Sequence, residues 1–209
     1  MFCDGTWNSP TIAQHTHVRQ LSEAVVQGAD QKCFYMSGVG TRRQRGGLFG
    51  GVLNRFGGGA FGWGLNEKIK SAYAELARNY EPGDEILIFG FSRGAYTARS
   101  LGGMIRKCGF PDKVTPATIN AAFRLYKKSG PANKPDDPHI LKDRAKLSPH
   151  FATSQTDLDS RTGGDVHLVR ISYVGIWDTV GALGLPVAVF GPVATLWNHR
   201  HQFHDTELS

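Results

Sequence analysis

The sequence has few cysteines and no long apolar run. Its 209 residues include three cysteines, Cys3, Cys33 and Cys108, which are widely spaced. An odd, scattered set fits reduced thiols better than a disulfide framework or a metal site. No stretch approaches about 18 consecutive apolar residues, the length typical of a transmembrane helix. The N-terminus also lacks the basic and apolar segments of a secretory signal, so we expect synthesis and folding in the cytoplasm.

The composition is that of an ordinary globular protein. Hydrophobic residues make up 40% and charged residues 20%, which predicts one domain over residues 1–209 with a substantial core. The net charge is +6, but the basic residues are dispersed apart from Arg42, Arg43 and Arg45. No aromatic-basic recognition module accompanies them, so we expect no nucleic-acid partner. Two interpretations of the positive charge stay open: a basic surface that is simply solvated, and a surface that contacts an anionic membrane.

Short apolar runs alternate with helical patterns along the chain. Residues 2–3 and 32–36 read as strands, while residues 18–25 and 65–76 carry apolar side chains at helical spacing. This alternation predicts a mainly parallel α/β sheet with helices on both faces. The ligand site of such a sheet lies at the carboxyl ends of its strands. Because the first strand is short as written, we expect the natural domain to begin several residues earlier.

Two segments interrupt the alternation. Residues 46–64 contain nine glycines and should not form a stable helix or strand throughout. A mobile apolar flap over a substrate site and a flexible surface loop are both compatible with that run. Residues 111–165 are rich in proline and polar side chains, which indicates a cap or insertion with a helix near residues 117–127. The core resumes with a strand over residues 167–177.

The most informative motif is Gly90-Phe91-Ser92-Arg93-Gly94. It follows the apolar run 86–89 and precedes helix-forming residues 95–108. This order is typical of a nucleophile elbow, in which a strained turn from strand to helix presents a serine over the sheet edge. Gly90 and Gly94 allow the strand and the helix to pass closely. An ordinary strand-to-helix turn is the alternative.

A serine nucleophile needs a base and an acid that orients the base. Asp178 directly follows a later strand and is the candidate acid, although an aspartate there could also cap a helix or close a turn. The oxyanion would be bound by the backbone amides of Arg93 and of Thr6, in the Gly5-Thr6 loop. We expect Asp4 to hold that loop by accepting amide hydrogen bonds, or else to contact substrate. No His or Cys lies at ligand spacing beside these carboxylates, so neither a metal nor another cofactor is expected.

Four motif blocks in this order resemble a known family, the alpha/beta hydrolases of the type VI secretion phospholipase effector kind, which include an uncharacterised bacterial branch. They are residues 2–8 (FCDGTWN), 38–41 (GVGT), 90–96 (GFSRGAY) and 174–181 (VGIWDTVG). The resemblance spans nearly the whole chain. It implies an α/β-hydrolase-like fold and a Ser-Asp-His triad with Ser92 as nucleophile and Asp178 as acid, acting on carboxylic esters. For some members these are phospholipid esters, and export needs no signal peptide.

The resemblance also implies a catalytic histidine after the aspartate, in a segment that this sequence does not show. Downstream of Asp178 stand only His199, His201 and His204, and His204 is the weak substitute among them. We therefore expect a fragment of a longer hydrolase, truncated at both ends, or a degenerate relative. Loss of a triad member commonly costs about 10⁴-fold or more in turnover, so the sequence does not decide whether the isolated chain is active.

The leading hypothesis is a serine esterase or lipase that forms an acyl-enzyme at Ser92. One alternative is a non-catalytic module on the same fold that binds a membrane or a partner. Another is a different acyl hydrolase, such as a thioesterase, a peptidase or a deacetylase, because the elbow alone does not separate these chemistries. The sequence sets neither the acyl-chain preference nor the oligomeric state.

Overall fold

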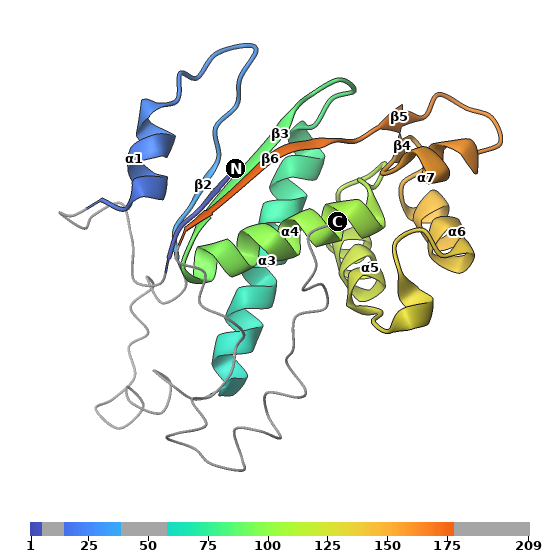
Figure 1. Ribbon diagram of the computed structural model, residues 1–209, viewed down its shortest axis with the longest axis horizontal. Helices are drawn as coiled ribbons and strands as arrows, with labels where there is room; N and C mark the ends of the chain where they lie inside the picture. Colours follow the sequence, from blue (N-terminus) through green and yellow to red (C-terminus); the bar gives the residue numbers. More distant parts are fainter. Residues whose placement is uncertain (6–14, 39–57, 178–209) are drawn as a thin grey trace. The chain divides into compact units, whose positions relative to one another are not determined.

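The computed structural model describes residues 1–5, 15–38 and 58–177 (Figure 1). Its main sheet has four strands in the order β2-β1-β3-β6. They are β1 (Phe2–Cys3), β2 (Tyr35–Met36), β3 (Ile86–Phe91) and β6 (Ile171–Trp177). β1 and β2 are parallel, with Phe2 opposite Tyr35. The Met1 amine donates to the Leu87 carbonyl and the Phe89 amide donates to the Met1 carbonyl, the slanted pattern of a parallel pair.

Helices alternate with these strands, which confirms the mainly parallel α/β class. Capping residues define two of the helix starts: the hydroxyls of Thr16 and Thr115 each accept a backbone amide in the first turn that follows. None of the described helices is both long and apolar enough to cross a membrane. The helices are α1 (His17–Ala24), α3 (Gly58–Asn79), α4 (Arg93–Cys108), α5 (Pro116–Lys127), the 3₁₀ turn η1 (Pro131–Asn133), α6 (Pro138–Leu147) and α7 (Gln155–Asp159).

The chain divides into two compact units. The helical unit comprises Met1, Ile69–Phe89 and Ala98–Gly175. The elbow unit comprises the described residues among 2–68, 90–97 and 176–177. The division falls within single helices and strands, so it does not test the prediction that residues 111–165 form a cap or insertion.

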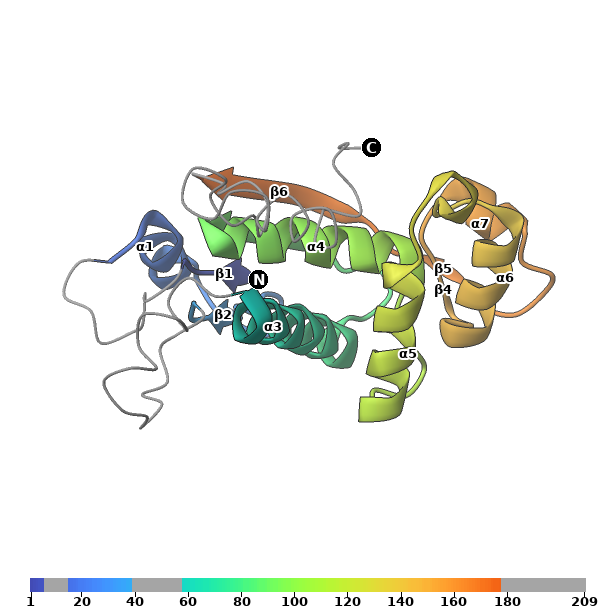
Figure 2. The same ribbon diagram turned by 90° about the horizontal axis from the view of Figure 1, so that it is seen from below.

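The helical unit has an aromatic core. Tyr73 and Phe110 are fully buried, and the Tyr73 hydroxyl donates to the Gly109 carbonyl at 2.6 Å. Tyr80 packs against Phe110 in a tilted arrangement and Phe151 packs against it edge-on, with ring centroids 5.0 and 6.2 Å away. Figure 2 shows α5 and α6 of this unit side by side.

A buried ion cluster lies in the same unit. Arg144 and Asp157 have no exposed side-chain surface, and Arg144 Nε lies 2.8 Å from Asp157 Oδ2. Asp157 also accepts from Arg161 Nε at 2.9 Å and from the Thr153 amide at 2.9 Å. Because each carboxylate oxygen is partnered, the charge is compensated inside the protein.

The helix expected near 117–127 and the strand-to-helix order around Ser92 are confirmed by α5, β3 and α4. The C-terminal part of the glycine-rich run 46–64 differs from the flap or loop that the sequence predicts. α3 begins at Gly58, so residues 58–64 are helical rather than a flap or a loop. Each glycine costs about 1 kcal/mol relative to alanine, and extension of an existing helix offsets this with one hydrogen bond per residue. Residues 46–57 lie outside the described residues.

The single strand predicted over 167–177 is wrong. The structure has β5 (His167–Leu168) and β6, separated by Val169 and Arg170. β5 pairs in parallel with β4 (Phe151–Ala152) in a separate two-stranded sheet, and the Val169 amide donates to the Ala152 carbonyl. An apolar run carries no information about which partner each half will pair with, because pairing is set by contacts distant in sequence.

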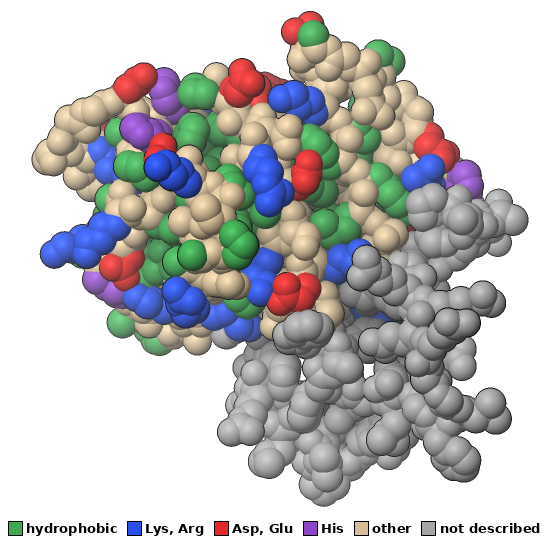
Figure 3. Space-filling model, turned by 180° about the vertical axis from the view of Figure 1, so that it is seen from behind, with side chains coloured by type: hydrophobic (Ala, Val, Ile, Leu, Met, Phe, Trp, Pro, Cys, Tyr) green, Lys and Arg blue, Asp and Glu red, His purple; other side chains and the backbone are tan. Residues whose placement is uncertain are grey.

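On the face seen in Figure 3, Lys and Arg side chains are dispersed among acidic and apolar ones.

Candidate active site

The turn from β3 into α4 has the backbone geometry of a nucleophile elbow. Ser92 has φ +54°, and it alone among the described non-glycine residues has a positive φ. That conformation is strained for an L residue and persists only where the surroundings fix it. The Ser92 carbonyl accepts from the Ala95 and Tyr96 amides at 3.0 and 3.4 Å, which holds the corner to the first turn of α4. Ser92 itself is partly exposed rather than buried.

Both glycines of the motif are required by close backbone approaches. A Cβ added at Gly90 would lie 2.5 Å from the Gly94 carbonyl oxygen. A Cβ added at Gly94 would lie 2.1 Å from the Cys3 carbonyl oxygen and 2.6 Å from that of Asp4. The first turn of α4 therefore passes directly against the end of β1, which only a residue without a side chain permits.

The end of β6 lies beside the serine. The Ser92 amide donates to the Trp177 carbonyl at 2.9 Å. Trp177 is the last residue of β6 and immediately precedes Asp178 in the sequence. β3 and β6 thus end at the same edge of the sheet, where a parallel α/β fold places its ligand site. Asp178 itself lies outside the described residues.

Asp4 follows β1 at the same edge and is buried, with 4% of its surface exposed. Its Oδ1 accepts from the Gly5 amide at 2.6 Å, and its Oδ2 accepts from the Tyr35 hydroxyl at 2.5 Å. The Thr16 hydroxyl lies 3.0 and 2.9 Å from the two oxygens. These donors engage both carboxylate oxygens of Asp4. The arrangement fits a side chain that holds the loop after β1 by accepting hydrogen bonds. Burial, followed by the hydrogen bond to Asp4, raises the pKa of Tyr35 well above its usual range.

Nothing in the motifs pointed to Thr16 and Tyr35. Tyr35 carried one weak signal, its place near the end of the strand expected over residues 32–36. Thr16 is the N-cap of α1 and accepts the Arg19 amide at 3.1 Å, so its hydroxyl links that helix to Asp4. Threonine before a helical pattern predicts a cap, but no local rule predicts the second contact.

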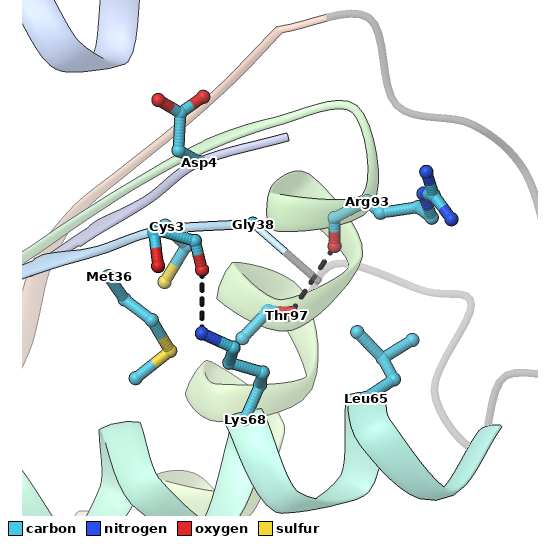
Figure 4. Close-up of a pocket in the computed structure, with 9 residues that line it drawn as sticks. Cys3, Asp4, Met36, Gly38, Leu65, Lys68, Arg93 and Thr97 are labelled. Atoms are coloured by element: carbon cyan, nitrogen blue, oxygen red, sulfur yellow. Dashed lines mark hydrogen bonds between the residues drawn. The ribbon is translucent and has the colours of Figure 1, made fainter. Parts of the chain in front are cut away.

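Arg93, Asp4 and Lys68 line a small pocket at the strand ends (Figure 4). Lys68 extends from α3 and its Nζ donates to the Ser37 carbonyl at 2.7 Å. In Figure 4 the Asp4 carboxylate is directed away from Lys68, and the Arg93 side chain extends away from both. The other lining residues are Cys3, Met36, Ser37, Gly38, Leu65 and Thr97.

The backbone of Arg93 begins α4. The first amides of a helix lack partners within the helix and carry partial positive charge, which suits them to bind an anion. Burial lowers the pKa of the Arg93 guanidinium to about 10, so the side chain remains charged at neutral pH. Thr6, the other amide expected at the oxyanion, lies outside the described residues.

Two of the three thiols, those of Cys3 and Cys108, are poor candidates for chemistry. Burial raises the pKa of both Cys3 and Cys108 to about 12. They remain protonated at neutral pH, and a thiol rather than a thiolate is a weak nucleophile. Within the described part of the chain, no group of three or more His, Cys, Asp or Glu side chains is arranged to hold a metal ion.

The described histidines have other neighbours than Ser92. No hydrogen bond joins Ser92 to a histidine among the described side chains; His15, His150 and His167 instead lie near Glu23, Asp112 and Asp165, at 3.1, 3.6 and 3.2 Å. His204, together with His199 and His201, lies outside the described residues.

A mainly parallel sheet, a strained serine between strand and helix, and a second strand ending beside it define an α/β-hydrolase-like protein. The model of the type VI secretion phospholipase effector Tle1-like catalytic domain matches residues 1–209, and the chain belongs to that family. The family is one of phospholipase effector catalytic domains, so hydrolysis of lipids is its activity at the family level.

A curated relative comes from a eukaryote. The uncharacterized protein YEL023C of Saccharomyces cerevisiae is 29% identical over 193 residues, which cover 87% of this chain and 26% of the yeast protein. The chain thus spans about a quarter of the length of that relative. No solved structure matches the chain.

Proposed function

We propose that this chain carries the catalytic serine of an esterase or phospholipase, and that Ser92 forms an acyl-enzyme with the acyl group of a lipid ester. The observation that supports this best is the left-handed backbone of Ser92, held by two sterically obligatory glycines at the carboxyl edge of the sheet. A strained, partly exposed serine at that position is costly to maintain, and such strain concentrates at functional sites.

In the proposed reaction a histidine removes the proton from Ser92 Oγ as Oγ attacks the ester carbonyl carbon. The resulting oxyanion is stabilised by the amides of Arg93 and Thr6, each contributing about 3 kcal/mol. The histidine then passes the proton to the leaving alcohol, and the acyl group stays on Ser92. A water molecule, activated by the same histidine, hydrolyses the acyl-enzyme and returns the proton to Ser92.

Asp178 is the proposed acid that orients this histidine. Its support is the bond between the Ser92 amide and the carbonyl of Trp177, the covalent neighbour of Asp178. His204 is the candidate base within the sequence, and a histidine from a further segment of a longer natural chain is the alternative. His204→Ala separates the two, since it inactivates the protein only in the first case.

The test is hydrolysis of short-chain and long-chain p-nitrophenyl esters by the full-length natural protein. Ser92→Ala should lower turnover by about 10⁴-fold or more, since it removes the nucleophile. Ser71→Ala is the matched control, because Ser71 is an exposed serine of α3. Undiminished hydrolysis in Ser92→Ala would show that Ser92 is not the nucleophile.

A further inference from the structure

A groove lies between α5 and α6 of the helical unit. Its volume is about 370 Å³, and it is open to solvent. α5 contributes Ala121, Arg124 and Leu125, Lys128 caps that helix, and α6 contributes Asp143, Lys146 and Leu147. The lining thus combines charged side chains with apolar ones.

The groove carries a surplus of positive charge. Lys128 Nζ and Asp143 Oδ2 are 2.7 Å apart, so these two charges neutralise one another. The hydrogen bond from Lys128 keeps the pKa of Asp143 below its usual value, and the pair persists at neutral pH. Arg124 and Lys146 remain, one on each wall. Both are exposed, and neither makes a hydrogen bond or ion pair with the residues that the structure describes; Lys146 acts on Asp143 only through a longer-range charge interaction, which also lowers the pKa of Asp143.

Helix electrostatics alone do not account for this arrangement. Arg124 and Lys146 each stand in the last turn of their helix, where a cation offsets the negative end of the helix dipole. This interaction with the helix end does not require either side chain to line the groove. Lys127 also stands in the last turn of α5, yet it does not line the groove, and its Nζ lies 5.9 Å from the centroid of the Phe123 ring. The placement of Arg124 and Lys146 beside apolar lining residues is therefore a property of the groove and not only of the helix ends.

We propose that the α5–α6 groove is a docking site for the anionic headgroups of a phospholipid surface. Two cations without an ion-pair partner among the described residues suit phosphodiester groups, and the half-buried Leu147 suits the first methylene groups of a lipid. This inference rests on the lipid substrate of the proposed function. An enzyme that acts on aggregated lipid gains from a surface that holds it at the interface, and clustered basic residues are known to bind anionic membranes.

The test measures binding to vesicles of phosphatidylcholine, with and without phosphatidylglycerol, in a Ser92→Ala background that prevents hydrolysis. The protein should bind only the vesicles that contain phosphatidylglycerol, and salt should weaken the binding through screening. Each cation near an anionic surface contributes about five-fold in affinity, so Arg124→Gln with Lys146→Gln should weaken binding about 25-fold.

The matched control is Lys127→Gln with Lys142→Gln. These lysines are exposed, belong to the same two helices and change the net charge equally, but do not line the groove. The control should bind nearly as the parent does. Equal losses in the two double variants would indicate non-specific attraction and would overturn the proposal, as would the absence of binding to anionic vesicles.

A second readout separates this proposal from the catalytic one. In the protein with Ser92 intact, the groove variant should hydrolyse soluble short-chain esters at the parent rate and vesicular phosphatidylglycerol more slowly. Unchanged vesicle hydrolysis would contradict the docking site while leaving the role of Ser92 intact. Absence of hydrolysis of any ester, together with groove-dependent vesicle binding, would refute the catalytic proposal alone.

Discussion

Substitution of Gly94 by alanine tests the elbow through its backbone rather than through its reactive group. The new Cβ would lie 2.1 Å from the Cys3 carbonyl oxygen, whereas real Cβ contacts below 3.0 Å are essentially never observed. The Cys3 carbonyl cannot easily move away, because backbone hydrogen bonds fix the two residues that flank Cys3 in the chain. The Phe2 amide donates to the Phe34 carbonyl at 2.8 Å and the Asp4 amide to the Met36 carbonyl at 2.9 Å.

Overpacking typically costs 1–3 kcal/mol, and a clash with backbone on a paired strand belongs at the upper end, about 3 kcal/mol. For a chain of this size that corresponds to a fall in melting temperature of about 6–12 °C. Relief of the clash would also move α4 away from β1 and displace Ser92. A displacement of about 1 Å can cost about 100-fold in rate.

The assays are thermal unfolding and ester turnover, with Gly102→Ala as the control in the same helix. A Cβ at Gly102 would meet only Ile171 Cδ1, at 3.7 Å, an ordinary contact. That variant should be as stable as the parent, or more stable by up to about 1 kcal/mol, because alanine favours a helix interior. Parental stability and turnover in Gly94→Ala would refute the close approach on which the elbow depends.

Three further predictions concern other residues. Asp178→Asn should reduce turnover about 10⁴-fold with little change in KM, as measured by steady-state kinetics. Asp157→Ala should lower the free energy of unfolding by about 3 kcal/mol in urea titrations, because it removes the nearest carboxylate from the buried Arg144 and leaves it only Asp136, at 3.7 Å. Cys3 and Cys108 should resist iodoacetamide at pH 8 in the native protein, as read by mass spectrometry, because burial raises their pKa to about 12; rapid alkylation would contradict their burial.

Local patterns were sufficient for the elements around the candidate nucleophile. The apolar run before Gly90, the glycine spacing and the helix formers after Gly94 specify a strand, a corner and a helix in immediate succession. Each of these signals acts over a few residues, and the structure has β3, Ser92 and α4 in that order. The helix expected near residues 117–127 was also found, as α5, and its start at Thr115 and Pro116 is set by local capping contacts.

Contacts between distant residues could not be read in this way. The carboxylate of Asp4 is held by Thr16 and Tyr35, which are 12 and 31 positions away. Their partnership depends on the pairing of β1 with β2 and on the entry of α1, which no local spacing encodes. The division of residues 167–177 between two sheets has the same origin, because Phe151 and Ala152 select the first half as their partner.

The most direct measurement of the central claim is the position of a fluorophosphonate adduct, found by peptide mass spectrometry of the natural full-length protein. The reagent bonds covalently to an activated serine, so the elbow predicts a single adduct on the peptide that contains Ser92 and none in Ser92→Ala. An adduct on another serine, or labelling that persists in Ser92→Ala, would contradict the assignment of Ser92 as the nucleophile.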